Sequence, residues 1–256
     1  MKKKQHSIPR RAFLGGLASS AAMTLSGCAE TEPPTYGSLL RFGDVVTYKA
    51  HRLLLPEMSL AREYELGDIS PAPAIGTTNP ADADWGLFDP EQGPIHERLQ
   101  RNGFADFRLT VEGSVARPGT FSLADLKRMP SRTQITRHTC EEGWSAIAQW
   151  TGVPLRSVLD AVGILPSARY VLFEAFDLWA DGIDMIDALH PQTILAYGMN
   201  GKDLPLGHGA PLRLRVERQL GYKSTKFVRR IVVTDRFDDN GPLGHIQNGW
   251  AWYTGI

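Results

Sequence analysis

This sequence has no surplus of charge of either sign and very few cysteines. It has 28 basic and 28 acidic residues, and its only cysteines are Cys28 and Cys140. The balanced charge argues against a nucleic-acid-binding protein, because phosphate recognition depends on a basic surplus. With 25 glycines and 17 prolines in 256 residues, the chain is also well below the composition of a low-complexity protein. These figures and 42% hydrophobic residues predict one large globular domain or two small ones.

Several short catalytic motifs are also missing. The sequence has no Gly-x-Ser-x-Gly elbow, no glycine-rich phosphate loop and no Cys-x-x-Cys-His haem-attachment site. An electron-transfer role would therefore need a redox partner outside this chain.

The N-terminus has the pattern of an export signal. Three lysines at positions 2–4 precede Arg10-Arg11-Ala-Phe-Leu14, which resembles a twin-arginine motif, and a short apolar stretch diluted by glycine and serine follows. Leu25-Ser-Gly-Cys28 resembles a lipobox, so we expect residues 1–27 to be removed and Cys28 to be a lipid anchor. Removing five basic residues would leave 23 basic against 28 acidic groups. The expected location is the periplasm or the exported cell envelope.

After the expected signal segment at residues 1–27, three further segments are predicted along the chain. Residues 28–36 are a polar, proline-containing tether. Residues 37–103 contain an amphipathic helix at 38–55, ended by Pro56, and a long irregular segment at 67–103. Residues 104–256 form the expected catalytic domain, with strands at 107–115, 135–139, 170–176, 193–199, 212–216 and 227–234. Short helices lie between some of these strands, after a capping box at 122–125 and near 154–162 and 186–190. This mixture predicts an α+β fold.

The segment around Cys140 is the first candidate site. Arg137 would favour the thiolate, whereas the adjacent Glu141 and Glu142 oppose it. One interpretation is a small buried residue at the end of a strand. The other is a reactive or metal-bound thiol, which would explain an unpaired cysteine in an exported protein.

A second candidate site lies between residues 200 and 226. Its glycines allow close backbone approach to a ligand, and Arg213, Lys223 and Lys226 supply cationic donors suited to an anionic cofactor. The alternative is a surface strand with solvated basic side chains.

Five ordered motifs together are more specific than either cluster. They are Cys140-Glu-Glu-Gly-Trp144, His190-Pro-x-Thr-Ile-Leu, Asn200-Gly-x-x-Leu-Pro, His208-Gly-Ala-Pro-Leu-Arg213 and Gly221-Tyr-Lys223-x-x-Lys226. In this order and spacing they resemble the molybdopterin-binding domain of the sulfite oxidase superfamily, and within it the catalytic subunits of periplasmic methionine sulfoxide reductases. The resemblance covers about residues 107–237 and implies a mixed-sheet fold. The chain ends at Ile256, so we expect no C-terminal immunoglobulin-like domain.

The resemblance implies a Mo-molybdopterin cofactor with Cys140 as the thiolate ligand of molybdenum. It implies that His208 and Arg213 hold the pterin and its phosphate, and that Ser224, Thr225 and Lys226 wrap the phosphate. Glu142 and Trp144 are candidates to shape the catalytic pocket. Three departures from the reductase pattern are Ala175, where a threonine is expected, His208, which replaces an asparagine and resembles sulfite oxidases, and Ser70, which aligns with a cofactor-binding asparagine.

The implied activity is two-electron oxygen-atom transfer, with reduction of a small-molecule or protein sulfoxide as the first expectation. Oxidation of sulfite is the alternative reaction, and an exported lipoprotein binding module without cofactor is the non-enzymatic alternative. The expected partner is a membrane cytochrome b or quinone-linked electron-transfer subunit, with this chain as a monomeric catalytic subunit.

Overall fold

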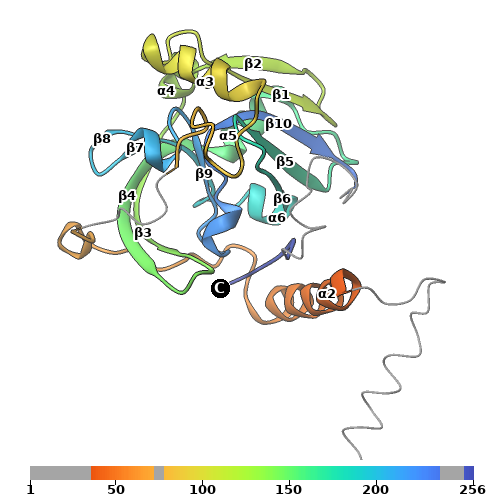
Figure 1. Ribbon diagram of the computed structural model, residues 1–256. Helices are drawn as coiled ribbons and strands as arrows, with labels where there is room; N and C mark the ends of the chain where they lie inside the picture. The colour runs from red at the N-terminus through yellow and green to blue at the C-terminus, as the bar shows by residue number, and fades with distance from the viewer. Residues whose placement is uncertain (1–35, 72–77, 237–250) are drawn as a thin grey trace, which may run out of the picture. The chain divides into compact units, whose positions relative to one another are not determined.

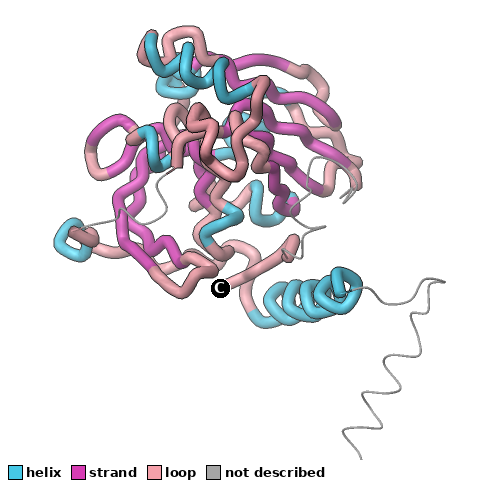
Figure 2. The backbone as a smooth tube through the Cα atoms, viewed as in Figure 1, coloured by secondary structure: helices cyan, strands magenta, loops and turns pink. Residues whose placement is uncertain are grey.

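Two β-sheets form the framework of the protein. In the computed structural model, which describes residues 36–71, 78–236 and 251–256, ten strands make two five-stranded sheets (Figures 1 and 2). The first sheet has the order β2-β1-β10-β5-β6, with β1 (Arg108–Gly113), β2 (Gly119–Ser122), β5 (Tyr170–Ala175), β6 (Ala180–Asp184) and β10 (Val228–Thr234). The second has the order β3-β4-β7-β8, with β9 also paired to β7; its strands are β3 (Arg132–Thr139), β4 (Ser145–Pro154), β7 (Ile194–Met199), β8 (Lys202–Asp203) and β9 (Arg213–Arg215).

Pairing is antiparallel throughout the second sheet, whereas the first includes one parallel pair, β1 with β10. The helices are short apart from α2 (Tyr36–Leu54); the others are α3 (Gln92–Arg101), α4 (Leu123–Arg128), α5 (Leu155–Val162) and α6 (Met185–Ala188), with 3₁₀ turns at η1 (Leu66–Asp68), η2 (Leu206–His208) and η3 (Gly221–Lys223). Mixed sheets with short helices confirm the predicted α+β class.

The elements predicted from local signals are confirmed. The capping box is complete, because the Ser122 hydroxyl accepts from the Asp125 amide and the Asp125 carboxylate accepts from the Ser122 amide. Asn200 and Gly201 both have positive φ, as the tight turn between β7 and β8 requires. Helix α2 ends at Leu54, just before Pro56.

Helix α3 and strands β2, β4, β6 and β8 were not predicted. Helix α3 lies in the segment expected to be irregular; Pro94 falls in its first turn, where a missing N–H is tolerated. Strand β4 is rich in small residues, and Gly152 is needed there because a Cβ would lie 2.3 Å from the Leu195 carbonyl oxygen. Strand β6, Ala-Asp-Gly-Ile-Asp, has low strand propensity but is buried along its whole length.

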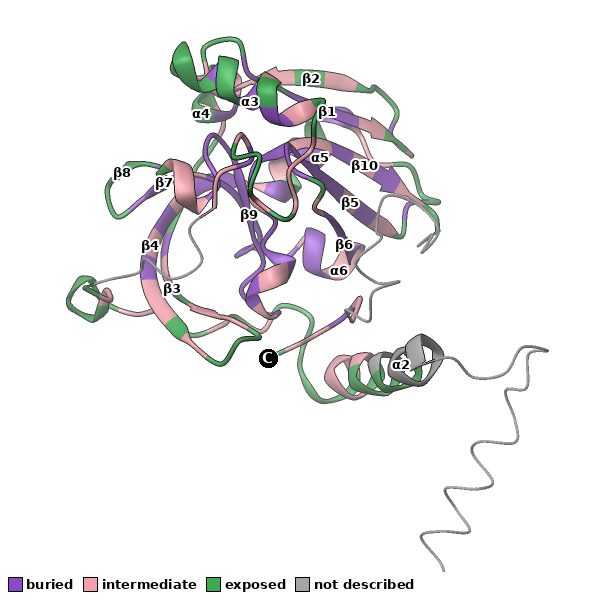
Figure 3. Ribbon diagram, viewed as in Figure 1, coloured by how far each residue is buried: buried purple, intermediate pink, exposed green. Residues whose placement is uncertain are grey.

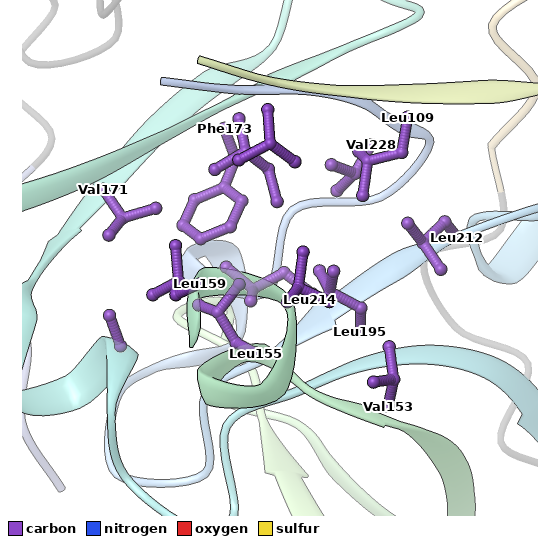
Figure 4. Close-up of a cluster of buried hydrophobic side chains, with 14 of the residues drawn as sticks. Leu109, Val153, Leu155, Leu159, Val171, Phe173, Leu195, Leu212, Leu214 and Val228 are labelled. Carbon is purple, nitrogen blue, oxygen red and sulfur yellow. The ribbon is translucent and has the colours of Figure 1, made fainter. Parts of the chain in front are cut away.

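The main core joins both sheets around α5. Leu155 and Leu159 from α5 are fully buried and point toward Val171 and Phe173 of β5 and toward strands of both sheets (Figure 4). The buried positions of α5 repeat at i, i+3, i+4 and i+7, the pattern of a helix with one apolar face. Figure 3 shows the same burial along the central strands. This packing places β4, β7 and β9 beside the first sheet, and the candidate site is built on these strands and their connections.

Residues from Gly37 to Ile256 form one compact unit. Arg52 near the C-terminal end of α2 connects this helix to β6 and α6 by ion pairs with Asp184 (2.8 Å) and Asp187 (3.1 Å). None of the helices within the described ranges is long and apolar enough to cross a membrane. The predicted signal segment 1–27, Cys28 and the tether up to residue 35 lie outside the described residues.

Candidate functional site

One cavity of about 320 Å³ brings together most of the predicted site residues. Cys140, Glu142, Trp144, His208, Arg213, Ser224, Thr225 and Lys226 all line it. Both sheets contribute, since the hairpin between β3 and β4 supplies the cysteine and the connection between β5 and β6 supplies Asp177. Two segments 73 residues apart in sequence, around Cys140 and around Arg213, therefore form a single site.

Cys140 sits in the turn of the β3–β4 hairpin. Its amide donates to the Trp144 carbonyl (2.9 Å), and the Gly143 amide donates to the Cys140 carbonyl (3.1 Å). Gly143 has a φ of 90°, which a side chain would disfavour. The Cys-Glu-Glu-Gly-Trp motif is therefore a tight turn that places the thiol and the Trp144 indole on one cavity wall.

The thiol is protonated in this environment. Burial raises the pKa of Cys140 to about 11, and the Glu141 and Glu142 carboxylates add to the shift. The sulfur lies 3.3 Å from Glu141 Oε2 and 3.7 Å from Glu142 Oε2. Since acidic neighbours oppose a bare thiolate, Cys140 would be an anion only beside a strong positive charge, which a bound metal ion supplies.

Glu142 and Trp144 are joined to each other. The Trp144 Nε1–H donates to Glu142 Oε2 at 2.7 Å, and the Trp144 ring lies 5.6 Å from the His138 ring. This hydrogen bond fixes a carboxylate and an indole beside the sulfur. Together with Trp85, Trp179 and Tyr222, the indole gives the cavity an aromatic lining.

Arg213 is a buried cation with an unmatched donor. It is 4% exposed; its Nη1–H donates to the His208 carbonyl (3.1 Å), while its Nε has no hydrogen-bond partner among the described residues. Burial and the neighbouring Arg215 lower the pKa of Arg213 to about 9. Burial, Arg213 and Lys226 lower the pKa of His208 to about 4, so its imidazole is neutral at pH 7. An anionic ligand would relieve the repulsion between these groups.

The segment 224–226 completes this part of the cavity. The Thr225 hydroxyl is buried without a hydrogen-bond partner in the described structure. The Lys226 ammonium donates to Gly207 O (3.2 Å) and Thr78 Oγ1 (3.3 Å), and burial together with Arg213 lowers its pKa to about 7. Gly209 has a φ of 111°, and a Cβ there would lie 3.0 Å from Lys226 Cβ. An arginine, a lysine and an unmatched hydroxyl around one volume fit a phosphate group.

Two predicted cofactor-binding residues do not line the cavity. Lys223 is fully buried, and its ammonium is bound by the Asp181 carboxylate and the Gly182 carbonyl (2.7 Å). Ser70 is bonded twice to β4: its amide donates to Ile147 O (3.0 Å), and its hydroxyl accepts from Ile147 N (2.9 Å). The Lys223 side chain therefore binds its loop to β6, and the Ser70 side chain binds its loop to β4.

Several cavity residues were missed by the sequence analysis. His138, two residues before Cys140, accepts from Arg215 Nη1 through Nδ1 (2.6 Å), so its Nε2 carries the proton. Asp177 is 7% exposed, and burial raises the pKa of its carboxyl to about 6. No short sequence motif includes Asp177. Its place in the cavity follows only from the pairing of β5 and β6, which the sequence did not predict.

Comparisons with known proteins agree with this site. Residues 94–241 match the family model described as "Oxidoreductase molybdopterin binding domain". "Putative protein-methionine-sulfoxide reductase subunit YedZ1" of Azospira oryzae is 34% identical over 96% of this chain and 87% of its own length. "Protein-methionine-sulfoxide reductase catalytic subunit MsrP" of Xanthomonas axonopodis pv. citri is 30% identical over 90% of this chain and 71% of its own length.

A solved structure shares the fold. The sulfane dehydrogenase SoxCD from Paracoccus pantotrophus matches with a TM-score of 0.50 and 24% identity, over 74% of this chain. The matched part is 55% of that solved chain, so this protein corresponds to about half of it. The family model covers more than half of this chain, and the relatives cover nearly all of it. The chain therefore belongs to the oxidoreductase molybdopterin-binding domain family, the family of sulfite oxidase.

Proposed function

We propose that this protein is the catalytic subunit of a molybdenum–molybdopterin enzyme that reduces methionine sulfoxide in proteins. The observation that carries the proposal is the pairing, in one cavity, of the Cys140 thiol with the buried donors Arg213 and Lys226. The cysteine suits a soft metal, and the donors suit the phosphate of a pterin cofactor. Relatives whose names include protein-methionine-sulfoxide reductase support the choice of substrate.

The proposed roles divide the cavity in two. Arg213 Nε, Lys226 Nζ and the Thr225 hydroxyl would bind the phosphate, with the neutral His208 beside them. Cys140 would be the protein ligand of the metal, and Glu142 with Trp144 would shape the space next to it. When bound, the cofactor supplies two-electron oxygen-atom transfer, which in balance is R₂SO + 2e⁻ + 2H⁺ → R₂S + H₂O.

The walls near Cys140 favour a neutral substrate over an anion. Carboxylates of Glu141 and Glu142 lie beside the sulfur, and indoles line the approach. Sulfite is an anion that these carboxylates would repel, whereas a sulfoxide is neutral and its methyl group can pack on an aromatic face. Arg137, the basic residue nearest to Cys140 in the sequence apart from His138, does not line the cavity; its guanidinium lies 5.5 Å from the centre of the Tyr64 ring.

We further propose export of the mature protein by the twin-arginine route and lipid attachment at Cys28. Export of folded protein suits an enzyme that receives its cofactor before crossing the membrane. Electrons would come from a membrane cytochrome b or quinone-linked subunit, since the sequence has no haem-attachment motif.

The first test is the metal content of purified protein from a host that makes the cofactor. We expect about one molybdenum per chain by elemental analysis, together with fluorescent pterin oxidation products. Cys140→Ser should retain pterin and lose turnover, because its hydroxyl is a poorer ligand for a soft metal. Neither metal nor pterin in the wild-type protein would reject the enzyme and support a binding module.

The second test compares substrates. With reduced viologen as electron donor, the enzyme should reduce free and protein-bound methionine sulfoxide. With ferricyanide as acceptor, it should oxidise sulfite much more slowly. Sulfite oxidation without sulfoxide reduction would overturn the proposed substrate and leave the cofactor assignment intact.

A further inference from the structure

Exposed apolar side chains gather in one short part of this protein. Among the described residues, twelve large hydrophobic side chains are exposed, and eight of them lie between positions 42 and 60: Phe42, Val45, Val46, Leu53, Leu54, Leu55, Met58 and Leu60. Exposed hydrophobic residues scattered singly need no explanation, but a contiguous group indicates an interaction surface.

Helix α2 has two faces that differ in what they contact. Its inner face packs on the compact unit: the Tyr48 ring lies 5.1 Å from Trp252, and Arg52 pairs with Asp184. Its outer face carries Phe42, Val46, Lys49 and Leu53, at i, i+4, i+7 and i+11, which place them on one side of a helix. The three apolar members of this outer stripe are 54%, 51% and 85% exposed. Green segments on α2 in Figure 3 mark part of this exposure.

The inner contacts explain why the outer stripe is not a misplaced core face. Arg52 is held by two buried carboxylates and lies over the Tyr48 and Tyr253 rings, at 5.1 and 5.3 Å. These bonds fix the rotation of the helix, since turning the apolar stripe inward would break the ion pairs and expose two aspartates. The ion pairs of Arg52 therefore keep the stripe facing away from the unit.

The position of α2 close to Cys28 in the sequence indicates what would cover the stripe. Only seven residues separate Cys28, the proposed lipid-attachment site, from Tyr36 at the start of α2. Eight Cα-to-Cα steps span at most about 30 Å even when fully extended, so an anchored chain would keep α2 next to the bilayer. The stripe also carries a cation, Lys49, and no acidic residue, which suits anionic head groups.

We propose that the outer stripe of α2 lies in the head-group region of a phospholipid bilayer and orients the catalytic unit on the membrane surface. This proposal depends on the proposed export of the protein, but not on its proposed cofactor or substrate. A lipid anchor at Cys28 would hold the chain at the membrane but would not fix how the catalytic unit is turned. The stripe adds a helix that lies along the membrane and so limits this orientation.

Vesicle flotation tests the proposal without the lipid anchor. The chain from residue 28 onward, loaded with cofactor and carrying Cys28→Ala, is mixed with vesicles of phosphatidylethanolamine and phosphatidylglycerol. We expect it to float with the vesicles. Val46→Glu combined with Leu53→Glu should lower the partition coefficient by at least about tenfold, since each loses the burial of one apolar side chain.

A matched control uses exposed hydrophobic residues elsewhere. Leu165 and Leu178 are 41% and 58% exposed and lie outside α2, so Leu165→Glu with Leu178→Glu should leave flotation unchanged. Circular dichroism and molybdenum content should be equal in all three proteins. Equal flotation of the α2 variant and the control, or no flotation of the parent chain, would overturn the proposal.

Insertion depth and partner class are tested separately. A Phe42→Trp reporter should be quenched by lipids brominated on their acyl chains, and Lys49→Glu should weaken binding only to vesicles that contain phosphatidylglycerol. Binding only to vesicles that contain membrane proteins would reject the lipid surface in favour of a protein partner. Because turnover of free methionine sulfoxide needs no membrane, failure here is distinguishable from failure of the proposed enzyme.

Discussion

Asp177 shows how burial alone creates a titrating group in the cavity. Its carboxylate accepts from the Trp179 amide (3.0 Å), yet burial raises its pKa from 3.8 to about 6. The folded chain therefore binds a proton at Asp177 more tightly than the unfolded chain does. The stability that this group contributes is present at low pH and is lost as pH rises from about 4 to about 6, by about 3 kcal/mol for a shift of this size.

Asp177→Asn should therefore stabilise the cofactor-free chain at pH 7.5, by up to about 3 kcal/mol, and have little effect at pH 4. Urea unfolding at pH 4, 5, 6 and 7.5 measures the difference between variant and wild type. Asp82→Asn is the control, because it makes the same change at an exposed position outside the cavity. A difference that is constant across this pH range would mean that Asp177 does not titrate in it.

Arg213 tests the phosphate-binding half of the site. Removing its charge should weaken pterin binding by about 10- to 100-fold, the value of a charge-assisted hydrogen bond of 1.5–3 kcal/mol. Arg213→Gln should therefore be purified with little pterin, while the cofactor-free chain stays folded because the lost cation was already disfavoured by burial. Arg156→Gln, at an exposed position of α5, should keep its pterin. Normal pterin content in Arg213→Gln would remove this residue from the proposed phosphate site.

The sequence allowed prediction of residue types better than of side-chain direction. Lys223 and Lys226 lie three positions apart in one motif, but only Lys226 lines the cavity. Lys223 is bound to Asp181 of β6, a strand that was not predicted. Two aspartates and a glycine disfavour a strand locally, and β6 instead relies on pairing with β5 and on a buried ion pair with a distant segment. Local strand propensity cannot predict such a partner, because the partner is distant in the sequence.

Elements with local signals behaved differently. The capping box of α4, the apolar periodicity of α5 and the Asn-Gly turn were predictable because each depends on residues within one or two turns of chain. Strand β4 was not, since Ala148 and Gly152 have weak strand propensity and the strand depends on its pairing with β3 and β7 on either side. Its hairpin with β3 nevertheless determines where Cys140 points.

The attachment of helix α2 to the rest of the unit depends on the ion pairs of Arg52 with Asp184 and Asp187. Removing Arg52 therefore tests what these ion pairs contribute to stability. Arg52→Met would leave Asp184 and Asp187 close together without their cation. Loss of one partner from a buried pair costs about 3–5 kcal/mol. Burial and Asp187 already raise the pKa of Asp184, and removing Arg52 would raise it further. The destabilisation should therefore be large at pH 7 and smaller at pH 5, where Asp184 can take up a proton.

Urea unfolding of Arg52→Met at the two pH values checks this expectation. Lys49→Met, one turn earlier on the exposed outer stripe, is the matched control and should change stability little. Equal destabilisation at pH 5 and pH 7 would show that lost packing of the arginine, rather than the unpaired carboxylates, dominates.

The cavity joins the two sheets, and this arrangement has a consequence for the whole molecule. Cys140 follows a strand of the second sheet, Asp177 follows a strand of the first, and Arg213 begins β9. A ligand held at once by these walls binds only the folded chain, so cofactor loading should stabilise both sheets together. At a ligand concentration 1,000 times the Kd, the gain is about 4 kcal/mol.

For a chain of this size, about 4 kcal/mol corresponds to a rise in Tm of about 8–16 °C. We expect holoenzyme and cofactor-free chain to differ by this amount in calorimetry, with near-ultraviolet and far-ultraviolet circular dichroism changing in a single coincident transition. Arg213→Gln, grown under the same conditions, should melt like the cofactor-free chain. If loading instead shifted only the near-ultraviolet transition, the cofactor would stabilise the aromatic cavity locally without coupling the two sheets.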